Sequence, residues 1–454
     1  MKKLLLLTLV TPLLFSITGC KQNTPSSEIS SSESEIIDFA PIDQEIKGTY
    51  EYFKLTTNYT EGSDGYGLTQ DRLTKTAYSS IAATGFLLGC YPVFVEQGYM
   101  NKEETATIVD KTFDTILRMQ ADSSTSYGGC ISHFVGKTTA KRYENSEVST
   151  IDTAILVSGV ITAAQYFGGE LIDKGNTIWG NVDFTKFKVT SAAGAACISM
   201  GVDNPSASSP KQLSPWDYYA EQLMIYILGV GNPVPEHRIS SLYYKSMLKN
   251  KGTYGDITHI YSWYGSIFTY QYSHAFFNFR DYKDAKGNNY FENSVNASKT
   301  NYLFCKSLKD NYKTFQEDAW GLTACDTPLG YSGLLGARPR GWGGNNDIQY
   351  LYIQGTVAPT GAISSMPFTP EESYRALVYY QSLEKLCDSK FGLRDAYNLD
   401  FNGAAWYDPD MIGIDKGIAA MQLYNYKVTD FVSNLAMNNK YVIQGFENNG
   451  FTKA

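Results

Sequence analysis

The apolar positions along this chain form two kinds of helical pattern. Segments that are apolar on nearly every face and rich in Ala, Gly and Ser are expected where helices are surrounded by other helices: residues 71–90, 149–167, 218–231 and 412–426. Two further segments, 101–120 and 371–389, carry charge on one face only, which is typical of an outer layer. Alternating patterns typical of strands are scarce, so we predict a mainly α-helical body from residue 66 onward.

Inner helices enclosed by outer helices form an α/α toroid, an architecture that holds roughly 400 residues in one domain. If the two kinds of helix alternate along the chain, the inner helices all run in one direction and their first residues meet at one rim. Asp71, Asp152, Glu221 and Asp415 stand at or near the starts of the four apolar segments. The pattern therefore predicts an acidic rim.

Carboxylates at helix starts have an ordinary explanation as well as a chemical one. Ser149 and Asp152 have the spacing of a capping box, and an acid in a first turn also suits the helix dipole. Glu221 differs, because Ser214 followed by Pro215 is the better helix start and leaves Glu221 about two turns inside, among apolar neighbours. Burial raises a carboxyl pKa, so Glu221 is suited to act as a general acid.

A second carboxylate that stays ionised would complete the pair of acids that glycosidases use. The alternative is a structural ion pair with Arg72, Arg142 or Arg280. Sugars also need flat apolar surfaces, and the chain has 35 Tyr, 23 Phe and 6 Trp. Many of these aromatic residues fall in the long connections 127–146, 251–272 and 320–362, which we expect to form the walls of a cleft.

The first twenty residues have the features of a lipoprotein signal peptide. Lys2 and Lys3 precede an apolar run from Leu4 to Phe15 that is too short to span a bilayer. The run ends in "ITGC", which resembles the lipobox of bacterial lipoproteins, so we expect acylation of Cys20; an ordinary secretory signal is the alternative. Residues 21–44 are rich in Ser and Glu and predict a flexible linker, which leaves residues 45–454 as one folded domain.

The net charge and the spacing of the cysteines limit which partners and metals the chain is expected to bind. The net charge of −8 disfavours a nucleic-acid partner, so we expect none. The cysteines after Cys20 are too widely spread for a metal site and too sparse for a disulfide scaffold. Most are expected to be small buried apolar residues: Cys90, Cys130, Cys197, Cys305, Cys325 and Cys387.

Eight motifs in collinear order carry a resemblance over residues 50–450. They are "YGLTQDRL", "STIDTAILVSG", "EQLMIYILGVG", "YQYSHAFFNFRD", "YFENS", "WGLTACDTP", "GTVAPTGAISSMPF" and "IGIDKGIAAMQLYNYK". Together they resemble the glycoamylase-like domain of bacterial endo-β-1,2-glucanases and cyclic β-1,2-glucan synthases. The resemblance implies an all-α (α/α)6 toroid, hydrolysis of β-1,2-glucan with inversion, and no metal or organic cofactor.

The resemblance also assigns site residues by motif. Glu221 is the expected general acid, with Asp152 and Glu147 as candidates for the base or for positioning of water. By motif, the expected substrate-binding residues are His274, Arg280, Trp320, Asp326 and Asp415. The predicted rim adds Asp71, and the aromatic clusters add Trp263 and Tyr272. Phe276 and Asn278 depart from the family pattern, in which Trp and Asp are common, and this departure leaves linkage specificity less secure than the fold.

The sequence thus predicts a monomeric glycoside hydrolase, lipid-anchored outside the cell, that binds an oligo- or polysaccharide. Two other readings stay open at this point. One is a polysaccharide lyase on the same toroid with a Tyr or His base such as His274. The other is a non-catalytic glycan-binding lipoprotein whose carboxylates only cap helices and accept hydrogen bonds from sugar hydroxyls.

Overall fold

The structure is a computed structural model that describes residues 38–342 and 353–453. Residues 39–454 form one compact unit. The predicted signal peptide, with Cys20, and the linker up to residue 37 lie outside the described residues. The linker was predicted to extend to residue 44, but helix α1 begins at Ala40, so folded structure starts earlier than the predicted boundary.

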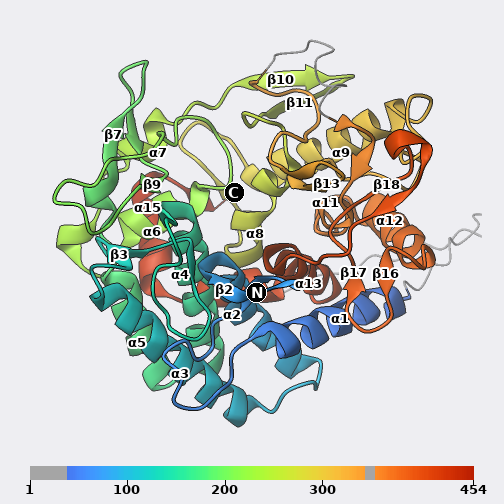
Figure 1. The fold of residues 1–454 in the computed structure, drawn as a ribbon. Coiled ribbons are helices and arrows are strands. Elements are labelled where there is room, and N and C mark those ends of the chain that lie inside the picture. The colour runs from blue at the N-terminus through green and yellow to red at the C-terminus, as the bar shows by residue number, and fades with distance from the viewer. Residues whose placement is uncertain (1–37, 343–352, 454) are drawn as a thin grey trace, which may run out of the picture. The chain divides into compact units, whose positions relative to one another are not determined.

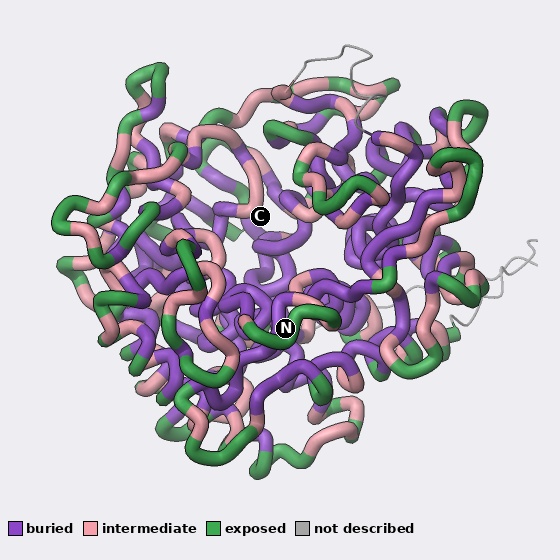
Figure 2. Tube along the Cα trace, viewed as in Figure 1, coloured by how far each residue is buried: buried purple, intermediate pink, exposed green. Residues whose placement is uncertain are grey.

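An inner set of helices lies at the centre of this unit (Figures 1 and 2). Their residues are almost all buried, which explains why the sequence is apolar on every face. The inner helices are α2 (Ile81–Glu96), α4 (Thr150–Phe167), α6 (Leu223–Gly231), α8 (Tyr272–Phe276), α11 (Pro359–Ile363) and α13 (Gly413–Lys427). By length and composition α4 could cross a membrane, but 72% of it is buried inside the protein, as expected of a core helix.

Amphipathic helices surround the inner set. They are α1 (Ala40–Thr56), α3 (Lys102–Ala121), α5 (Glu170–Gly180), α9 (Tyr290–Ser307), α12 (Pro370–Ser382) and α15 (Lys440–Asn449), with the short helices α7 (Leu242–Ser246) and α14 (Phe431–Ala436) beside them. Asn101 and Asn289 cap α3 and α9 by accepting hydrogen bonds from backbone N–H groups of the first turn. The double ring confirms the predicted (α/α)6 toroid.

Two glycines allow inner helices to touch. A Cβ atom on Gly85 of α2 would lie 2.6 Å from Leu156 Cα of α4, and a Cβ atom on Gly159 would lie 2.0 Å from Gly85 O. No side chain fits at either position without moving a backbone. The small residues of the apolar segments therefore set the spacing between α2 and α4.

Short antiparallel strands decorate the helical rings. The two three-stranded sheets are β1 (Gln70–Arg72), β2 (Lys75–Ser80) and β5 (Phe134–Gly136), and β15 (Thr356–Val357), β18 (Tyr397–Asn398) and β19 (Trp406–Tyr407). The two-stranded pairs are β3 (Ser126–Tyr127) with β4 (Cys130–Ile131), β6 (Val148–Ser149) with β9 (Gly201–Val202), β7 (Lys188–Thr190) with β8 (Ala196–Ile198), β10 (Lys251–Tyr254) with β11 (Ile257–Ile260), β12 (Tyr282–Lys283) with β20 (Thr452–Lys453), β13 (Cys325–Thr327) with β14 (Gly330–Ser332), and β16 (Cys387–Asp388) with β17 (Gly392–Leu393).

The structure corrects two predicted helix starts. The segment 71–90 is helical only from Ile81, and Asp71 lies on strand β1. Ser214 and Pro215 do not start a helix: α6 begins at Leu223, so Glu221 lies in the turn before α6 rather than inside it. Asp152 and Asp415 stand in the first turns of α4 and α13 as predicted. The described cysteines are free thiols, all buried except the half-buried Cys387, which confirms their predicted role as packing residues.

Candidate active site

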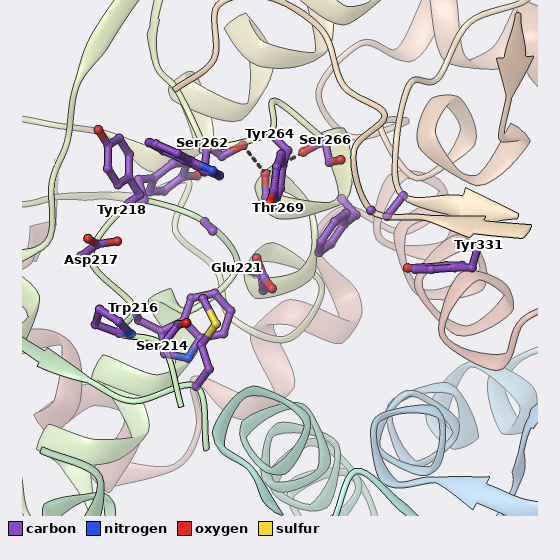
Figure 3. A pocket seen from close by; sticks show the side chains of 18 residues that line it. Ser214, Trp216, Asp217, Tyr218, Glu221, Ser262, Tyr264, Ser266, Thr269 and Tyr331 are labelled. Carbon is purple, nitrogen blue, oxygen red and sulfur yellow. Dashed lines mark hydrogen bonds between the residues drawn. The ribbon is translucent and has the colours of Figure 1, made fainter. Parts of the chain in front are cut away.

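A cavity of about 640 Å³ opens among the segment before α6, the segment 262–269 and the β13–β14 hairpin (Figure 3). Its walls are largely aromatic: the Tyr218 and Trp263 rings meet edge to face at 4.8 Å, and Trp263 is 40% exposed. Tyr331 faces the cavity from the β14 side. These are flat apolar surfaces on which a sugar ring can stack. The structure therefore places Trp263 where the sequence predicted a substrate-binding residue.

Glu221 lies on the cavity wall, between the Tyr218 side and Tyr331 (Figure 3). Its backbone carbonyl accepts a hydrogen bond from Ser273 Oγ at 2.7 Å, which ties the turn before α6 to α8. Burial raises the pKa of the Glu221 carboxyl to about 7, its own backbone N–H opposes the shift, and the nearby Asp152 charge adds to it. Within residues 38–342 and 353–453, no Lys or Arg forms an ion pair with Glu221. Glu221 can therefore hold a proton near neutral pH.

Tyr272, a predicted substrate-binding residue, does not line the cavity. It is buried at the start of α8, and the pKa of its hydroxyl is raised well above its usual value, first by burial and then by the charges of Asp415, Glu221 and Asp152. Three carboxyl groups from α4, α13 and the turn before α6 thus act on one phenol. The inner helix starts converge on one region, as the toroid predicted.

Asp152 caps its helix and also lies beside His133. Ser149 Oγ donates a hydrogen bond to Asp152 Oδ2, and the Asp152 backbone N–H donates to Ser149 Oγ at 3.2 Å, which is a helix cap. The other oxygen, Oδ1, lies 3.6 Å from His133 Nε2. Capping therefore occupies only one carboxylate oxygen.

Glu147 belongs to the same group of side chains. Its Oε1 lies 3.0 Å from His133 Nδ1. Burial raises the pKa of Glu147, but the hydrogen bond and charge of His133 outweigh burial, so the pKa is lowered from its ordinary value. Glu147 is therefore an ionised carboxylate at neutral pH.

A second acidic group surrounds Arg72. Arg72 Nη1 donates to Asp326 Oδ2 at 2.6 Å and lies 3.8 Å from Asp410 Oδ2, and Arg72 Nε lies 3.3 Å from Asp71 Oδ2. Asp326 pairs with Tyr331 across the β13–β14 hairpin, so this group borders the cavity. Arg72, one of three arginines considered for a structural ion pair, therefore holds Asp71 and Asp326 together.

Three further aspartates, Asp395, Asp408 and Asp415, interact with this group of carboxylates. Burial and neighbouring carboxylates raise the pKa of Asp408 to about 8 and that of Asp395 well above its usual range. Burial likewise raises the pKa of Asp415 to about 7. Carboxyl groups this close cannot all ionise, so they share protons at neutral pH.

Two of these aspartates, together with Asp326, have the spacing of metal ligands. One carboxylate oxygen each from Asp326, Asp395 and Asp408 lie within 4.8 Å of one another. Oxygen donors of this kind suit a hard divalent cation. Arg72 and the retained protons already offset the negative charge, however, so we assign no metal here.

Three predicted substrate-binding residues do not line the cavity: His274 and Trp320 are buried, and Arg280 is partly exposed elsewhere. His274 packs among Phe279, Phe291 and Phe368, and burial lowers its pKa to about 3, so it is neutral. Its Nε2 lies 3.0 Å from Ser294 Oγ. These contacts make His274 a structural residue and remove it as the base of a lyase.

Arg280 and Trp320 are also structural. The Arg280 guanidinium donates to both oxygens of Asp430, at 2.7 and 2.9 Å, and stacks on Phe291. Trp320 is fully buried, and its backbone N–H donates to Tyr380 Oη. Neither residue lines the cavity, so the prediction that they bind substrate in the cleft was wrong.

Phe276 and Asn278, which depart from the family pattern, are buried too. Phe276 packs on Phe86 in the core. Asn278 donates to Asn434 Oδ1 at 2.8 Å. Neither lines the large cavity, so these two departures bear on packing rather than on the cavity wall.

Sequence reasoning missed His133, Asp395 and Asp408. His133 lies in the connection 127–146, which was noted only as a cleft wall. Asp408 stands in "WYDPDMIGID", where three aspartates occur within eight residues, and that density was an available signal. For His133 the sequence offers one weak signal, which is its position shortly before the acidic motif "ENSEVSTID".

Comparison with known proteins agrees with this architecture. The sequence profile of the family described as "Putative glucoamylase" matches residues 214–440, which is half of the chain. The chain belongs to this glycoamylase-like family.

A curated relative, the "Exo beta-1,2-glucooligosaccharide sophorohydrolase (non-reducing end)" of Parabacteroides distasonis, is 26% identical over 465 residues. The alignment covers 94% of this chain, and the chain spans about 60% of the length of that relative. A solved structure titled as an endo-beta-1,2-glucanase from Chitinophaga pinensis, in complex with sophorotriose and glucose, has a TM-score of 0.75 and 22% identity, covering 92% of this chain and 99% of that one. A putative glucoamylase from Bacteroides uniformis has a TM-score of 0.76 and 23% identity, covering 93% and 99%.

Proposed function

We propose that this protein is an inverting glycoside hydrolase that cuts β-1,2-linked glucan internally. One observation carries the proposal: Glu221 lies on the wall of a sugar-sized aromatic cavity, has a pKa of about 7, and has Asp152 close enough to influence that pKa. A carboxyl group that holds its proton beside one that does not is the arrangement that glycosidases use. Family membership and the named activities of the relatives support the same assignment.

The proposed reaction needs one proton donor and one proton acceptor. Glu221 donates its proton to the glycosidic oxygen as the bond to the anomeric carbon breaks. A water molecule attacks the opposite face of that carbon, and Asp152 accepts the proton that the water loses. Inversion requires a gap of roughly 6.5–9.5 Å between the two carboxyl groups to hold the water. Glu147 lies behind Asp152 across His133 and helps to position the carboxylate that acts as base.

The aromatic wall supports a saccharide substrate. Tyr218, Trp263 and Tyr264 offer adjoining ring faces beside Glu221. The preference for β-1,2 linkages rests on the relatives, since the sugar-complexed Chitinophaga structure is titled as an endo-beta-1,2-glucanase. The endo mode is our choice between the two modes that the relatives' names describe.

Product analysis tests this proposal. Purified protein is incubated with linear β-1,2-, β-1,3-, β-1,4- and β-1,6-glucans, and the products are separated by thin-layer chromatography. We expect a ladder of oligosaccharides from β-1,2-glucan alone, whereas immediate release of sophorose as the sole product would indicate exo action. Proton NMR of the first products should show the α-anomer, as inversion of a β-linkage requires.

Two outcomes would overturn the hydrolase assignment. Unsaturated products that absorb in the ultraviolet would indicate a lyase. Binding of β-1,2-glucan without release of reducing ends would indicate a glycan-binding protein. Active hydrolysis of a different linkage would keep the enzyme class and change the substrate.

We also propose that the protein is anchored outside the cell by lipid on Cys20. The support is the sequence "ITGC" after a short apolar run and the Ser/Glu-rich segment that follows it. Labelled palmitate fed to the expressing cells should be incorporated into the wild type and into Cys387→Ala, which removes a cysteine of the folded domain. It should be absent from Cys20→Ala, and equal labelling of all three proteins would contradict the anchor.

A further inference from the structure

His133 is held rigidly beside Glu147 and Asp152. It lies between β4 and β5, and its backbone N–H donates to Glu147 O at 2.8 Å while its carbonyl accepts from Ile81 N at 3.1 Å. Its ring stacks on Phe134 with centroids 3.8 Å apart. The imidazole therefore has a fixed plane and fixed directions for both ring nitrogens.

Each ring nitrogen points to a carboxylate. Nδ1 lies 3.0 Å from Glu147 Oε1, and Nε2 lies 3.6 Å from Asp152 Oδ1. A neutral imidazole has one nitrogen without a hydrogen, which would face an oxygen lone pair. Only the doubly protonated ring is complementary to both carboxylates.

The electrostatic surroundings of His133 agree with that geometry. Burial lowers the pKa of His133, but Asp152, Glu147 and Asp71 together raise it to about 9, so the ring is charged at neutral pH. Arg142 also acts on Glu147, yet its guanidinium is bonded to Ser146 O and Asp203 O. Among the described residues, His133 is the cation that contacts both Glu147 and Asp152.

We propose that His133 is a positioning residue, a cationic clamp that fixes Asp152 and Glu147 as one ionised pair. This inference rests on the proposed function, because it assigns the clamp to the carboxylate that accepts the proton from water. Ser149 holds Asp152 Oδ2 and His133 holds Oδ1, so both oxygens of the proposed base have a set direction. Glu147 anchors the far side of the imidazolium and keeps the ring charged.

The clamp has a consequence for the pH dependence of catalysis. Loss of the cation leaves Asp152 and Glu147 facing each other without a positive charge between them. Like charges at close range favour protonation, and shifts of about one to three pH units are typical of such losses. The acid limb of the profile of kcat/KM against pH should therefore move upward, because protonation of the pair removes the base.

Three variants separate charge from packing. His133→Gln keeps a donor but removes the charge, His133→Lys keeps a charge, and His237→Gln is the control, since His237 lies in the distant segment 235–237 and contacts Gly180 O. We expect the acid limb of His133→Gln to rise by about one pH unit. The acid limb of His133→Lys should shift by no more than a third of that amount. The acid limb of His237→Gln should coincide with that of the wild type. An acid limb in folded His133→Gln that overlays the wild type would overturn the proposal.

A second measurement does not depend on the substrate. The chain has four histidines, so the His133 ring signal can be assigned by NMR from the His133→Gln spectrum. We expect this signal to titrate above pH 8 in the wild type and to fall toward the ordinary value near 6.5 in a Glu147→Gln, Asp152→Asn double variant. Titration near 6.5 in a wild type that cleaves β-1,2-glucan would refute the clamp alone. A wild type that shows the high titration but cleaves no glycan would refute the proposed function alone.

Discussion

Two regions with carboxyl groups differ in whether an arginine pairs with those groups. Around Arg72, one guanidinium lies within ion-pair distance of Asp71, Asp326 and Asp410. Around Glu221, the described residues supply apolar and aromatic neighbours and the charge of Asp152, but no Lys or Arg partner. Arg72 holds its neighbouring carboxylates in ion pairs, whereas the Glu221 carboxyl can hold a transferable proton near neutral pH.

The contrast shows that burial alone does not define a catalytic acid. Glu45 is more deeply buried than Glu221, yet Lys416 binds it and the Leu393 backbone N–H donates to it. An ion pair of that kind holds two chain segments together, here α1 and α13. A carboxyl group is suited to proton transfer when burial comes without a neutralising partner and the group still reaches a cavity.

The largest expected effect comes from removing the transferable proton. Glu221→Gln should lower kcat about a thousandfold, within the range for loss of a general acid, and leave KM nearly unchanged. Reducing-end assays on β-1,2-glucan measure both constants, and circular dichroism checks the fold. A variant that keeps more than a tenth of the wild-type kcat would remove Glu221 from the acid role.

The next effect distinguishes the two acidic regions as the source of the base. Asp152→Asn should lower kcat about a hundredfold at unchanged KM, because water activation is lost. Asp415→Asn should change kcat by less than about fivefold, because a neutral amide resembles the protonated form that burial favours at Asp415. If Asp415→Asn proves the more damaging of the two, the base belongs to the Arg72 region and the roles must be exchanged.

Removal of the cation from the Arg72 region should reduce stability. Arg72→Met leaves buried carboxylates without their partner and should cost roughly 2 kcal/mol of unfolding free energy at pH 7, less than a fully buried pair because Arg72 is partly exposed. The cost should shrink at pH 5, since protonation of these carboxylates relieves their repulsion. Urea denaturation at both pH values measures it.

The control for that experiment is Arg375→Met. Arg375 pairs with Asp318 at 2.9 Å on the surface, where both side chains are a third or more exposed. Its loss should cost under about 1 kcal/mol. Equal destabilisation by both variants would mean that the Arg72 ion pairs have no special stabilising role.

The smallest effect on the rate, taken over one pH unit, is the alkaline limb of the wild-type rate profile. The acid must carry its proton, so kcat/KM should fall as pH rises through about 7, the pKa of Glu221, by roughly tenfold per pH unit. Initial rates on β-1,2-glucan from pH 5 to pH 9 in a constant-ionic-strength buffer test this. A rate that stays level to pH 9 would contradict Glu221 as the protonated group.

The helical rings were predictable because their pattern is long and repeated. Helices α4 and α13 start where the sequence indicated, since capping and dipole effects act locally on Asp152 and Asp415. Glu221 was misplaced into a helix because Pro215 looked like a first-turn proline, whereas the chain there pairs Ser199 with Pro215 as an isolated bridge. Tertiary contacts overrode the local signal.

Candidate site residues could be predicted from the sequence only where a local pattern marks them. Trp263 was found from aromatic density in a loop, and Glu221 from an acid among apolar residues. His274, Arg280 and Trp320 were misassigned because a motif records that a residue matters without saying whether it packs or binds. His133 could not be identified, since its partners Glu147 and Asp152 lie 14 and 19 positions further along the chain and only the fold brings them to its ring.

The contact between Gly85 and Gly159 has a bearing on how this enzyme family could vary. At that point the main chains of α2 and α4 touch directly, so the spacing between α2 and α4, which carries Asp152, is set by backbone rather than by side chains. Loops at the mouth of the toroid can then lengthen or change sequence without altering the packing of α4, which carries the proposed base Asp152. Within one domain, the loops at the mouth are thereby free to change while the helix packing behind them stays the same.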